Sequence, residues 1–527
     1  MEFLLRMSFT NIELLGLLLL VFGVLGIWFF EKTSSVAVFL YDQRKIKLGF
    51  CLLGILCAVC GMCSLGSTVT SPEFGLINDG WAKVGRLVLS VMLFLVVGLD
   101  NKKISWVNCG GGGVSAELFL IMSLLFSVSV LVSTIHLVLL VIFFETISLL
   151  MYVLALRNSS KDLVLGEAVL KYVLASGLSS GLLYLGMYFI FCSSLLPTSL
   201  SGWSDPSAAW VSFVFGSRLV EDLLLGIDLA LNLVGAVCIV TGFSFKFGLF
   251  PFHAWMPDLY QGLSLQGLGY FMLIPKVAFF FALLRLEIWF AGSSFLSSVG
   301  LSCVFIIFGV LSVVLGAVMM FGQFNLKRLL AFSSIHNFGY IFVALGLGST
   351  KGLIISTTFL IFYILVTIGL LLVLKQVSLP LVGDLTSDIR LFIGSLPVSH
   401  RKLSYILFVY LFILLGLPLS FGFVVKAQVI LSLCSLEHEF FNGVFLAVVL
   451  MFCSFLSVIV YLRLLVECFF NNNAVLQTPP SVSPKCGGAY DLLLFVIILS
   501  IAFYFSFGWC FTGYDFLFNV VHCLFIF

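Results

Sequence analysis

The stretch FSFKFGLFPFHAWMPDLYQG, residues 243–262, places Lys246 inside an apolar segment and follows it with Gly248, Pro251 and Pro257. A charge at the centre of a membrane-spanning helix costs roughly 2.5–3.5 kcal/mol on insertion scales. Glycine and proline interrupt helices, because glycine is conformationally free and proline lacks a backbone N–H. The stretch therefore predicts a membrane helix that is broken next to a buried cation.

Other charges have similar surroundings: Glu145 in VIFFETISLLMYVL (141–154), Lys276 in LIPKVAFFFALL (273–284) and Lys426 in FVVKAQVIL (423–431). Helix breakers precede Lys426 at Gly416, Pro418 and Gly422, which predicts a second broken helix. The two lysines at predicted breaks are 426 − 246 = 180 residues apart. Interrupted helices at matching places in two halves of a chain indicate the transport site of inverted-repeat transporters.

The composition extends this interpretation to the whole chain. Of its 527 residues, 61% are hydrophobic and 9% are charged, and apolar runs recur from end to end. Runs of about 20 apolar residues cross a bilayer as helices, because backbone polar groups must pair internally in lipid. The sequence predicts an all-α polytopic membrane protein without a soluble nucleotide-binding module. We interpret the glycine run at 110–113 as a loop between helices.

We place fourteen spans in the chain. The third span begins at residue 83, and the last two lie in the C-terminal part of the chain. The predicted spans are 11–30, 46–66, 83–99, 115–133, 135–156, 167–193, 224–246, 262–286, 299–321, 328–348, 352–374, 403–433, 443–462 and 491–513. They predict N-terminal helices 1–3 in 1–114, a first five-helix repeat in 115–298, an inverted second repeat in 299–470, and helix 14 in 471–527. Helices 7 and 12 are the broken ones.

Basic residues in alternate loops divide 16 against 6, and Lys83, Arg86 and Lys375 are counted among these loop residues. Positive charges gather on the cytoplasmic or matrix side. Because the number of spans is even, both termini are expected to face the intermembrane space or the periplasm. The remaining four of the 26 basic residues all fall within spans: Lys171, Lys246, Lys276 and Lys426. Lys171 lies near a span end and either reaches the interface or serves as a relay.

Burial disfavours the charged form of a lysine, and a nearby carboxylate favours it. A buried lysine and glutamate can therefore exchange protons with modest energetic cost, which is the chemistry of a proton relay. The alternative is a structural ion pair. His336 and Asn337 lie within a predicted span with Ser333 and Ser334, and a relay role and a helix-packing role are both plausible for them. We interpret Cys57, Cys60 and Cys63 as small apolar residues, and we expect no metal site.

Five segments together resemble the antiporter-like membrane subunits of respiratory complex I. They are FFETISLLMYVLALRN (143–158), FKFGLFPFHAWMPDLYQG (245–262), PKVAFFFALLRL (275–286), NLKRLLAFSSIHNFGYIFVALG (325–346) and GLPLSFGFVVKAQ (416–428). Within that group, PFHAWMPDLYQG is similar to the chain 2 branch rather than to the branches of chains 4 and 5. The resemblance covers roughly residues 115–435.

The resemblance implies a row of proton-transfer residues: Glu145 on the fifth helix, Lys246 on the broken seventh, Lys276 on the eighth and Lys426 on the broken twelfth. It also implies partners in the other membrane-arm subunits and in membrane lipids, and no contact with nucleic acid. NADH, FMN, iron–sulfur clusters and ubiquinone are expected in other subunits, with no cofactor in this chain. The implied location is the mitochondrial inner membrane, or the inner membrane of a bacterium.

The chain departs from the family pattern at one relay position. After AxSSI the family usually has a histidine where this chain has Asn337, and His336 lies one residue earlier. Either His336 reaches the same proton path from another angle, or this relay point is lost. Two other functions remain open on the sequence: a cation/proton antiporter subunit outside complex I, and a structural subunit that conducts no protons.

Overall fold

The computed structural model describes residues 76–99, 113–158 except residue 135, 163–194, 221–292, 299–378, 401–416, 420–434 and 442–470, with short stretches between residues 17 and 71. These residues are helical apart from turns and one hairpin, in which β1 (Val69–Ser71) pairs antiparallel with β2 (Leu76–Asn78). The hairpin was not predicted. It lies between two predicted spans, where strand pairing does not compete with a membrane helix.

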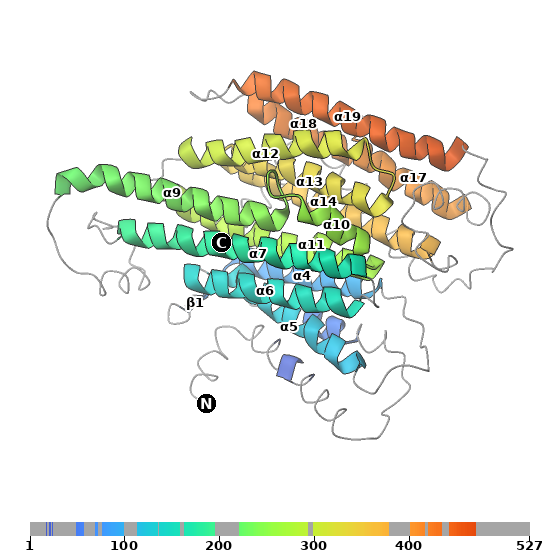
Figure 1. The fold of residues 1–527 in the computed structure, drawn as a ribbon, viewed down its shortest axis with the longest axis horizontal. Helices are drawn as coiled ribbons and strands as arrows, with labels where there is room; N and C mark the ends of the chain where they lie inside the picture. Colours follow the sequence, from blue (N-terminus) through green and yellow to red (C-terminus); the bar gives the residue numbers. More distant parts are fainter. Residues whose placement is uncertain are drawn as a thin grey trace. The chain divides into compact units, whose positions relative to one another are not determined.

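Figure 1 labels the helices in chain order. They are α4 (Gly80–Val97), α5 (Gly113–Ser133), α6 (Leu137–Asn158), α7 (Leu163–Ser194), α9 (Glu221–Phe247), α10 (Trp255–Gly262), α11 (Leu265–Gly292), α12 (Val299–Met320), α13 (Leu326–Leu345), α14 (Thr350–Ser378), α17 (Arg401–Leu415), α18 (Phe421–Cys434) and α19 (Gly443–Phe470).

In the described part of the chain, nine helices are long and apolar enough to cross a bilayer, and three shorter apolar helices accompany them. Every predicted span from 83–99 to 443–462 overlaps one of the helices. The prediction of an all-α polytopic membrane protein is therefore confirmed. Predicted span 491–513, and the cysteines at positions 57, 60 and 63, lie outside the described residues.

Both predicted helix breaks are present. α9 ends at Phe247, and α10 begins at Trp255. The second break separates α17 from α18. Each break begins with a glycine in the left-handed region, Gly248 with φ 68° and Gly416 with φ 71°. Side chains with a Cβ are disfavoured at such angles, so these two positions require glycine.

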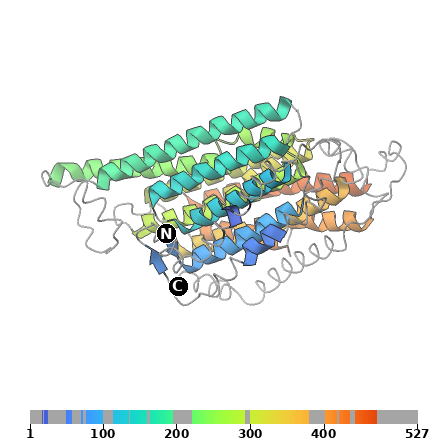
Figure 2. The ribbon, with the colours of Figure 1, turned by 90° about the horizontal axis from the view of Figure 1, so that it is seen from below.

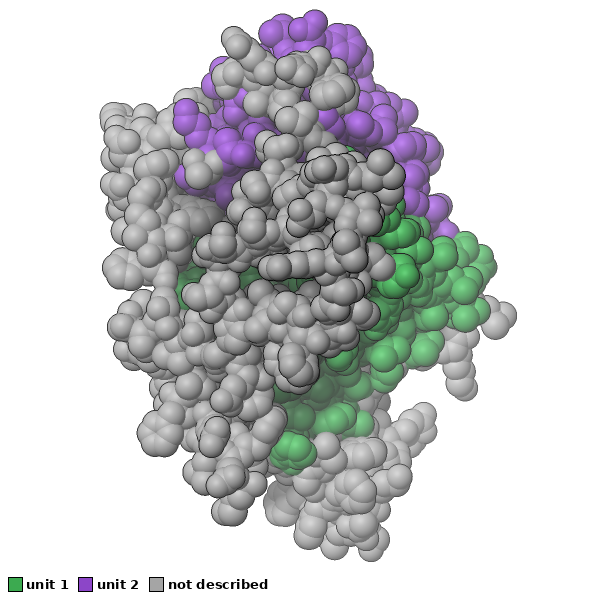
Figure 3. All heavy atoms as spheres, turned by 90° about the vertical axis from the view of Figure 1, so that its left-hand side faces the viewer, with its two compact units in different colours: residues 1–246, 266–301, 523–527 green, residues 247–265, 302–522 purple. Residues whose placement is uncertain are grey.

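Chain contacts divide the molecule into two compact units, coloured separately in Figure 3. Unit 1 comprises residues 1–246, 266–301 and 523–527, and unit 2 comprises residues 247–265 and 302–522. Residues 247–265, which include the short helix α10, belong to unit 2, although the rest of the first predicted repeat belongs to unit 1. The predicted repeat boundaries at 115–298 and 299–470 stay a prediction.

An ion pair joins three helices of unit 1. Asp79 caps α4 by accepting a hydrogen bond from the Ala82 N–H at 3.0 Å. Arg285 of α11 donates to the same carboxylate oxygen at 2.7 Å and to the Ser133 carbonyl, at the end of α5, at 3.3 Å. Because one guanidinium binds groups from two other helices, it fixes the ends of α4, α5 and α11 relative to one another.

In unit 2, glycines allow α12 and α13 to approach closely. A Cβ added to Gly309 would lie 2.9 Å from the Gly339 carbonyl oxygen, which is too close for a side chain. The start of α13 also holds α10 in place: Lys327 Nζ donates to the Leu263 carbonyl at 2.7 Å, and Arg328 pairs with Asp258 at 3.0 Å. Small residues and polar contacts of this kind are typical of helix packing in membranes.

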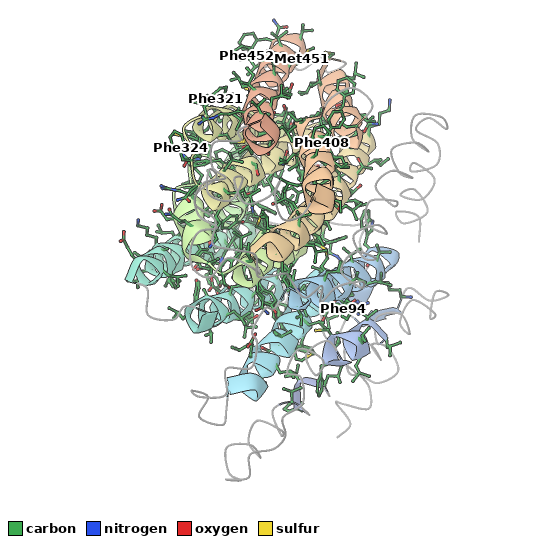
Figure 4. All side chains as sticks on the ribbon, turned by 90° about the vertical axis from the view of Figure 1, so that its right-hand side faces the viewer. Phe94, Phe321, Phe324, Phe408, Met451 and Phe452 are labelled. Atoms are coloured by element: carbon green, nitrogen blue, oxygen red, sulfur yellow. The ribbon has the colours of Figure 1, made fainter. Side chains whose placement is uncertain are left out.

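The outward faces of several helices are apolar. In unit 1, α6 packs against α7, and the two run side by side in both ribbon views (Figures 1 and 2). In unit 2, Met451 and Phe452 are more than half exposed and point away from α19 (Figure 4). A protein in water rarely exposes such large apolar areas, whereas lipid tails accommodate them.

Candidate functional site

Lys246 lies in the last turn of α9 and only 4% of it is exposed. Its Nζ lies 4.8 Å from the centre of the Phe144 ring. Phe144 precedes Glu145 on α6 and also packs against Phe243 of α9 and Phe279 of α11, at 5.3 and 4.4 Å between ring centres. Unit 1 therefore brings Lys246 and Glu145 together around one aromatic side chain, and Glu145 acts electrostatically on the lysine.

Hydrogen bonds among the described residues do not occupy every polar atom of Glu145 and Lys246. Glu145 Oε2 accepts from the Ser148 hydroxyl at 3.2 Å, whereas Oε1 and Lys246 Nζ are buried without hydrogen-bond partners among the described residues. Buried polar atoms without protein partners are the usual binding places of ordered water. The negative end of the α9 dipole further stabilises an ammonium in its last turn.

Lys276 is the most enclosed of the three lysines, with 1% exposure. It follows Pro275 inside α11, and the flanking residues Val277 and Phe279 are also buried. A proline within a helix cannot donate to the carbonyl four residues earlier, which leaves that oxygen available to other polar groups. Lys276 is thus an enclosed lysine of unit 1, with Glu145 and Lys246 on other helices of the same unit.

Lys426 of α18 is 5% exposed and lies beside the second break. Its Cδ is 3.5 Å from the position that a Cβ of Gly416 would take. The stem of this lysine therefore passes the C-terminal end of α17, where unpaired helix carbonyls attract a cation. Lys246 and Lys426 share this setting, since each lies at the carbonyl end of an interrupted helix.

His336 of α13 belongs to the environment of Lys426, which acts on it electrostatically. The centre of the Tyr340 ring lies near both residues, 5.2 Å from the imidazole centre and 5.9 Å from Lys426 Nζ. His336 Nδ1 lies 3.0 Å from the Val313 carbonyl oxygen, which can only accept, so Nδ1 carries the hydrogen. Nε2 is then the free acceptor of the neutral ring, buried without a partner among the described residues.

The structure does not bring every candidate into these groups. Lys171 pairs with Glu167 at 2.9 Å on the surface of α7, and the two side chains are 45% and 68% exposed. Asn337 is buried on α13 next to His336.

Some buried charges were missed or misplaced by the sequence interpretation. The assignment of Lys83, Arg86 and Lys375 to loops is wrong, because all three are buried within α4 or α14. Glu117 on α5 is buried too. These residues lie within about two turns of a helix end, where sequence alone does not distinguish an inward side chain from one that reaches the interface. The feature of the sequence that could have identified these residues is a charge within an otherwise apolar run.

Comparisons with known proteins agree with this geometry. A family described as "NADH:quinone oxidoreductase/Mrp antiporter, TM" matches residues 134–454, more than half of the chain. The chain belongs to this family of membrane subunits.

Within the family, the chain is similar to subunit N of NADH-quinone oxidoreductase. The subunit N of Rhizorhabdus wittichii is 30% identical over 423 residues, covering 79% of this chain and 80% of the relative. Two solved structures share the fold, each at 22% identity. An archaeal membrane-bound sulfane sulfur reductase has a TM-score of 0.75 and matches 98% of this chain and 97% of its own. Respiratory complex I from Thermus thermophilus has a TM-score of 0.66 and matches 94% and 98%.

Proposed function

We propose that this chain is a proton-translocating subunit of the membrane arm of NADH:quinone oxidoreductase. The observation that carries the proposal is the burial of Lys246, Lys276 and Lys426 inside helices of a member of this family. Buried lysines are costly in a membrane and mark ion or proton paths. Glu145, Lys246, Lys276 and Lys426 then form the row along which protons move, driven by electron transfer in other subunits.

Glu145 and Lys246 act in this proposal as a gate. When both are charged they stabilise each other, and when one gains or loses a proton the other is left as an unpaired buried charge. Proton binding at one residue therefore changes the affinity of the other. Glu145 Oε1 and Lys246 Nζ, which have no hydrogen-bond partner among the described residues, are the atoms at which a water molecule would connect the two side chains.

His336, rather than Asn337, is the relay residue of the second unit in this proposal. An asparagine amide does not gain or lose a proton near neutral pH, whereas imidazole does. With Nδ1 held by the Val313 carbonyl, Nε2 is available to take a proton and return it. The one-residue shift in the sequence then moves the relay point without removing it.

We infer that the chain takes part in NADH:ubiquinone reductase as a subunit without redox chemistry of its own. NADH, FMN, iron–sulfur clusters and ubiquinone would be held by other subunits. Its partners would be neighbouring membrane-arm subunits, including antiporter-like ones, together with lipids. The excess of basic residues in alternate loops supports termini that face the intermembrane space of a mitochondrion, or the periplasm in a bacterium.

Replacing Lys276 tests the proposal. Lys276→Met keeps the length and apolar packing of the side chain but removes its charge, so the assembled complex should form while the number of protons pumped per NADH oxidised falls. The ratio is measured with the complex reconstituted into liposomes. Lys171→Met, which changes an exposed lysine of the same unit, is the matched control. An unchanged ratio in Lys276→Met would contradict a role for this lysine.

A cation/proton antiporter subunit outside complex I is the second candidate, because the matching family includes Mrp antiporters. The same buried lysines could serve such a transporter. Sodium-dependent proton transport by the chain without NADH-oxidising subunits would favour this candidate. Co-purification of the chain with NADH:quinone reductase activity would exclude it.

A further inference from the structure

Three tyrosines from three helices of unit 2 converge on two adjacent serines of α13. Tyr260 of α10 and Tyr363 of α14 both interact with Ser334, and they also interact with each other. Tyr461 of α19 interacts with Ser333. All five side chains are almost completely buried. We call Tyr260, Ser333, Ser334, Tyr363 and Tyr461 the hydroxyl cluster.

The serines have a fixed direction in this cluster. Ser334 Oγ donates to the Ala331 carbonyl at 2.7 Å, with Met256 Sδ as an alternative acceptor at 3.2 Å, and Ser333 Oγ donates to the Leu330 carbonyl at 2.8 Å. Each serine hydroxyl has one hydrogen, so both serine oxygens face the tyrosines as acceptors. The tyrosine hydroxyls can donate to them, which leaves the lone pairs of the tyrosine oxygens available to other donors.

The Tyr363 hydroxyl lacks a complete set of hydrogen bonds from the residues that the structure describes. It is enclosed, and although it lies against Ser334, it completes no hydrogen bond of good geometry within the described part of the chain. Leaving a buried hydroxyl unsatisfied costs about 1–3 kcal/mol. Ordered water satisfies such groups in other proteins, and a site with several hydroxyls offers the two to four partners that a buried water needs.

The cluster is adjacent to the relay histidine. Ser333 precedes His336 by three residues on α13, and side chains at this spacing lie on the same face of a helix, one turn apart. Hydroxyl groups and water both donate and accept hydrogen bonds, so together they can carry a proton. We propose that the hydroxyl cluster is an internal water site and that it passes protons to His336. This inference rests on the proposed function and adds to it the groups that supply the second unit.

Tyr363→Phe is the sharpest test, because it removes only the oxygen atom and keeps the ring that packs against Phe338 at 5.0 Å. In the assembled complex, the wild type should show ordered water within hydrogen-bonding distance of the Tyr363 hydroxyl in a high-resolution structure. The variant should lose it. The initial rate of proton pumping should fall roughly fivefold, which corresponds to about 1 kcal/mol, the net value of one hydrogen bond.

Tyr410→Phe is the matched control. It removes another buried hydroxyl of unit 2, on α17, where the tyrosine ring lies against Gly369 of α14. The control should pump at the rate of the wild type. Equal losses in the two variants, a wild-type rate in Tyr363→Phe, or the absence of water at the cluster would each overturn the inference.

Lys426→Met separates this inference from the function on which it rests. Loss of pumping in Lys426→Met with full pumping in Tyr363→Phe would overturn the role of the cluster and leave the proposed function standing. Full pumping in both variants would contradict the proposed function as well.

Discussion

The two lysines at the broken helices have similar backbones around them and different partners. Lys246 in unit 1 lies near a carboxylate, Glu145, whereas Lys426 in unit 2 lies near an imidazole, His336. Each lysine is at most 5% exposed and lies at the carbonyl end of a helix. The backbone thus provides a common setting for a buried cation, and the partner decides how many charges the site holds.

The partners have opposite electrostatic consequences. An ammonium and a carboxylate attract each other, so unit 1 can hold both charges at once. An ammonium and an imidazolium repel each other, so in unit 2 the proton on one of the two bases disfavours a proton on the other. Under the predicted pairing of spans 4–8 with spans 9–13, α13 corresponds to α6, and His336 takes the place of Glu145. The second site would then share one proton between two bases.

Replacing the glycine at each helix break with alanine should reveal the largest difference between the two sites, measured as a loss of stability. Gly248→Ala would place a Cβ at positive φ and against Met256, whereas Gly416→Ala would meet atoms at 3.5 Å, which is ordinary contact. A left-handed conformation costs a non-glycine residue about 1–2 kcal/mol, and overpacking adds about 1–3 kcal/mol. Gly248→Ala should therefore lower the melting temperature of the assembled complex more than Gly416→Ala. Equal losses would show that the space at Gly248 does not matter.

Replacing His336, the partner of Lys426, should have the second-largest effect, on the rate of proton pumping. His336→Gln keeps a donor for the Val313 carbonyl but removes the group that gains and loses a proton. Proton pumping should slow roughly 100-fold, the lower end of what a positioned acid or base contributes. Asn337→Ala, one residue away on the same helix, should pump normally. The opposite ranking of these two variants would return the relay role to the position where the family has its histidine.

The ion pair within unit 1 and the ion pair within unit 2 should differ in their contribution to stability by a smaller amount. Arg285→Met removes contacts to Asp79 and to the Ser133 carbonyl, while Arg328→Met removes a more exposed pair with Asp258. Exposed pairs are worth about 0–1 kcal/mol, and buried ones about 3–5 kcal/mol when one partner is removed. Arg285→Met should thus cost about 2 kcal/mol, between these limits, and more than Arg328→Met, as measured by thermal unfolding of the complex. The reverse order would contradict the importance of the Asp79 contact.

Lys171→Met should have the smallest effect. The lysine and its partner Glu167 are both exposed on α7, and pairs four residues apart on a helix are worth about 0.3–0.5 kcal/mol. Both the melting temperature and the proton-to-electron ratio should remain close to the wild type. A large fall in the ratio would restore Lys171 to the proton path and remove the distinction between exposed and buried lysines.

Local patterns predicted the parts of this structure that depend on local physics. Gly248 and Gly416 break helices because of their own backbone freedom, so both breaks could be predicted from the sequence. The length of apolar runs predicted the helices, because backbone polar groups in lipid must pair within the segment itself. Lys246, Lys276 and Lys426 were identified as buried because each is a charge surrounded by apolar residues, although Lys246 lies at the end of its predicted span.

Other features depend on contacts that the sequence does not contain. The Val313 carbonyl that orients His336 lies 23 residues away, and the burial of Lys83 and Arg86 in α4 depends on the helices that pack around them. The hairpin β1–β2 forms from three-residue strands, which are too short to give a periodic signal. The hydroxyl cluster combines four helices, so no single segment of sequence indicates it.

In the proposed function, the buried lysines at the two breaks carry protons. This role is tested most directly by the number of protons pumped per NADH oxidised in liposomes containing the complex with Lys246→Met or Lys426→Met, beside Lys171→Met. We expect a lower ratio in both buried-lysine variants and a wild-type ratio in the Lys171 variant. Wild-type ratios in all three variants would contradict it.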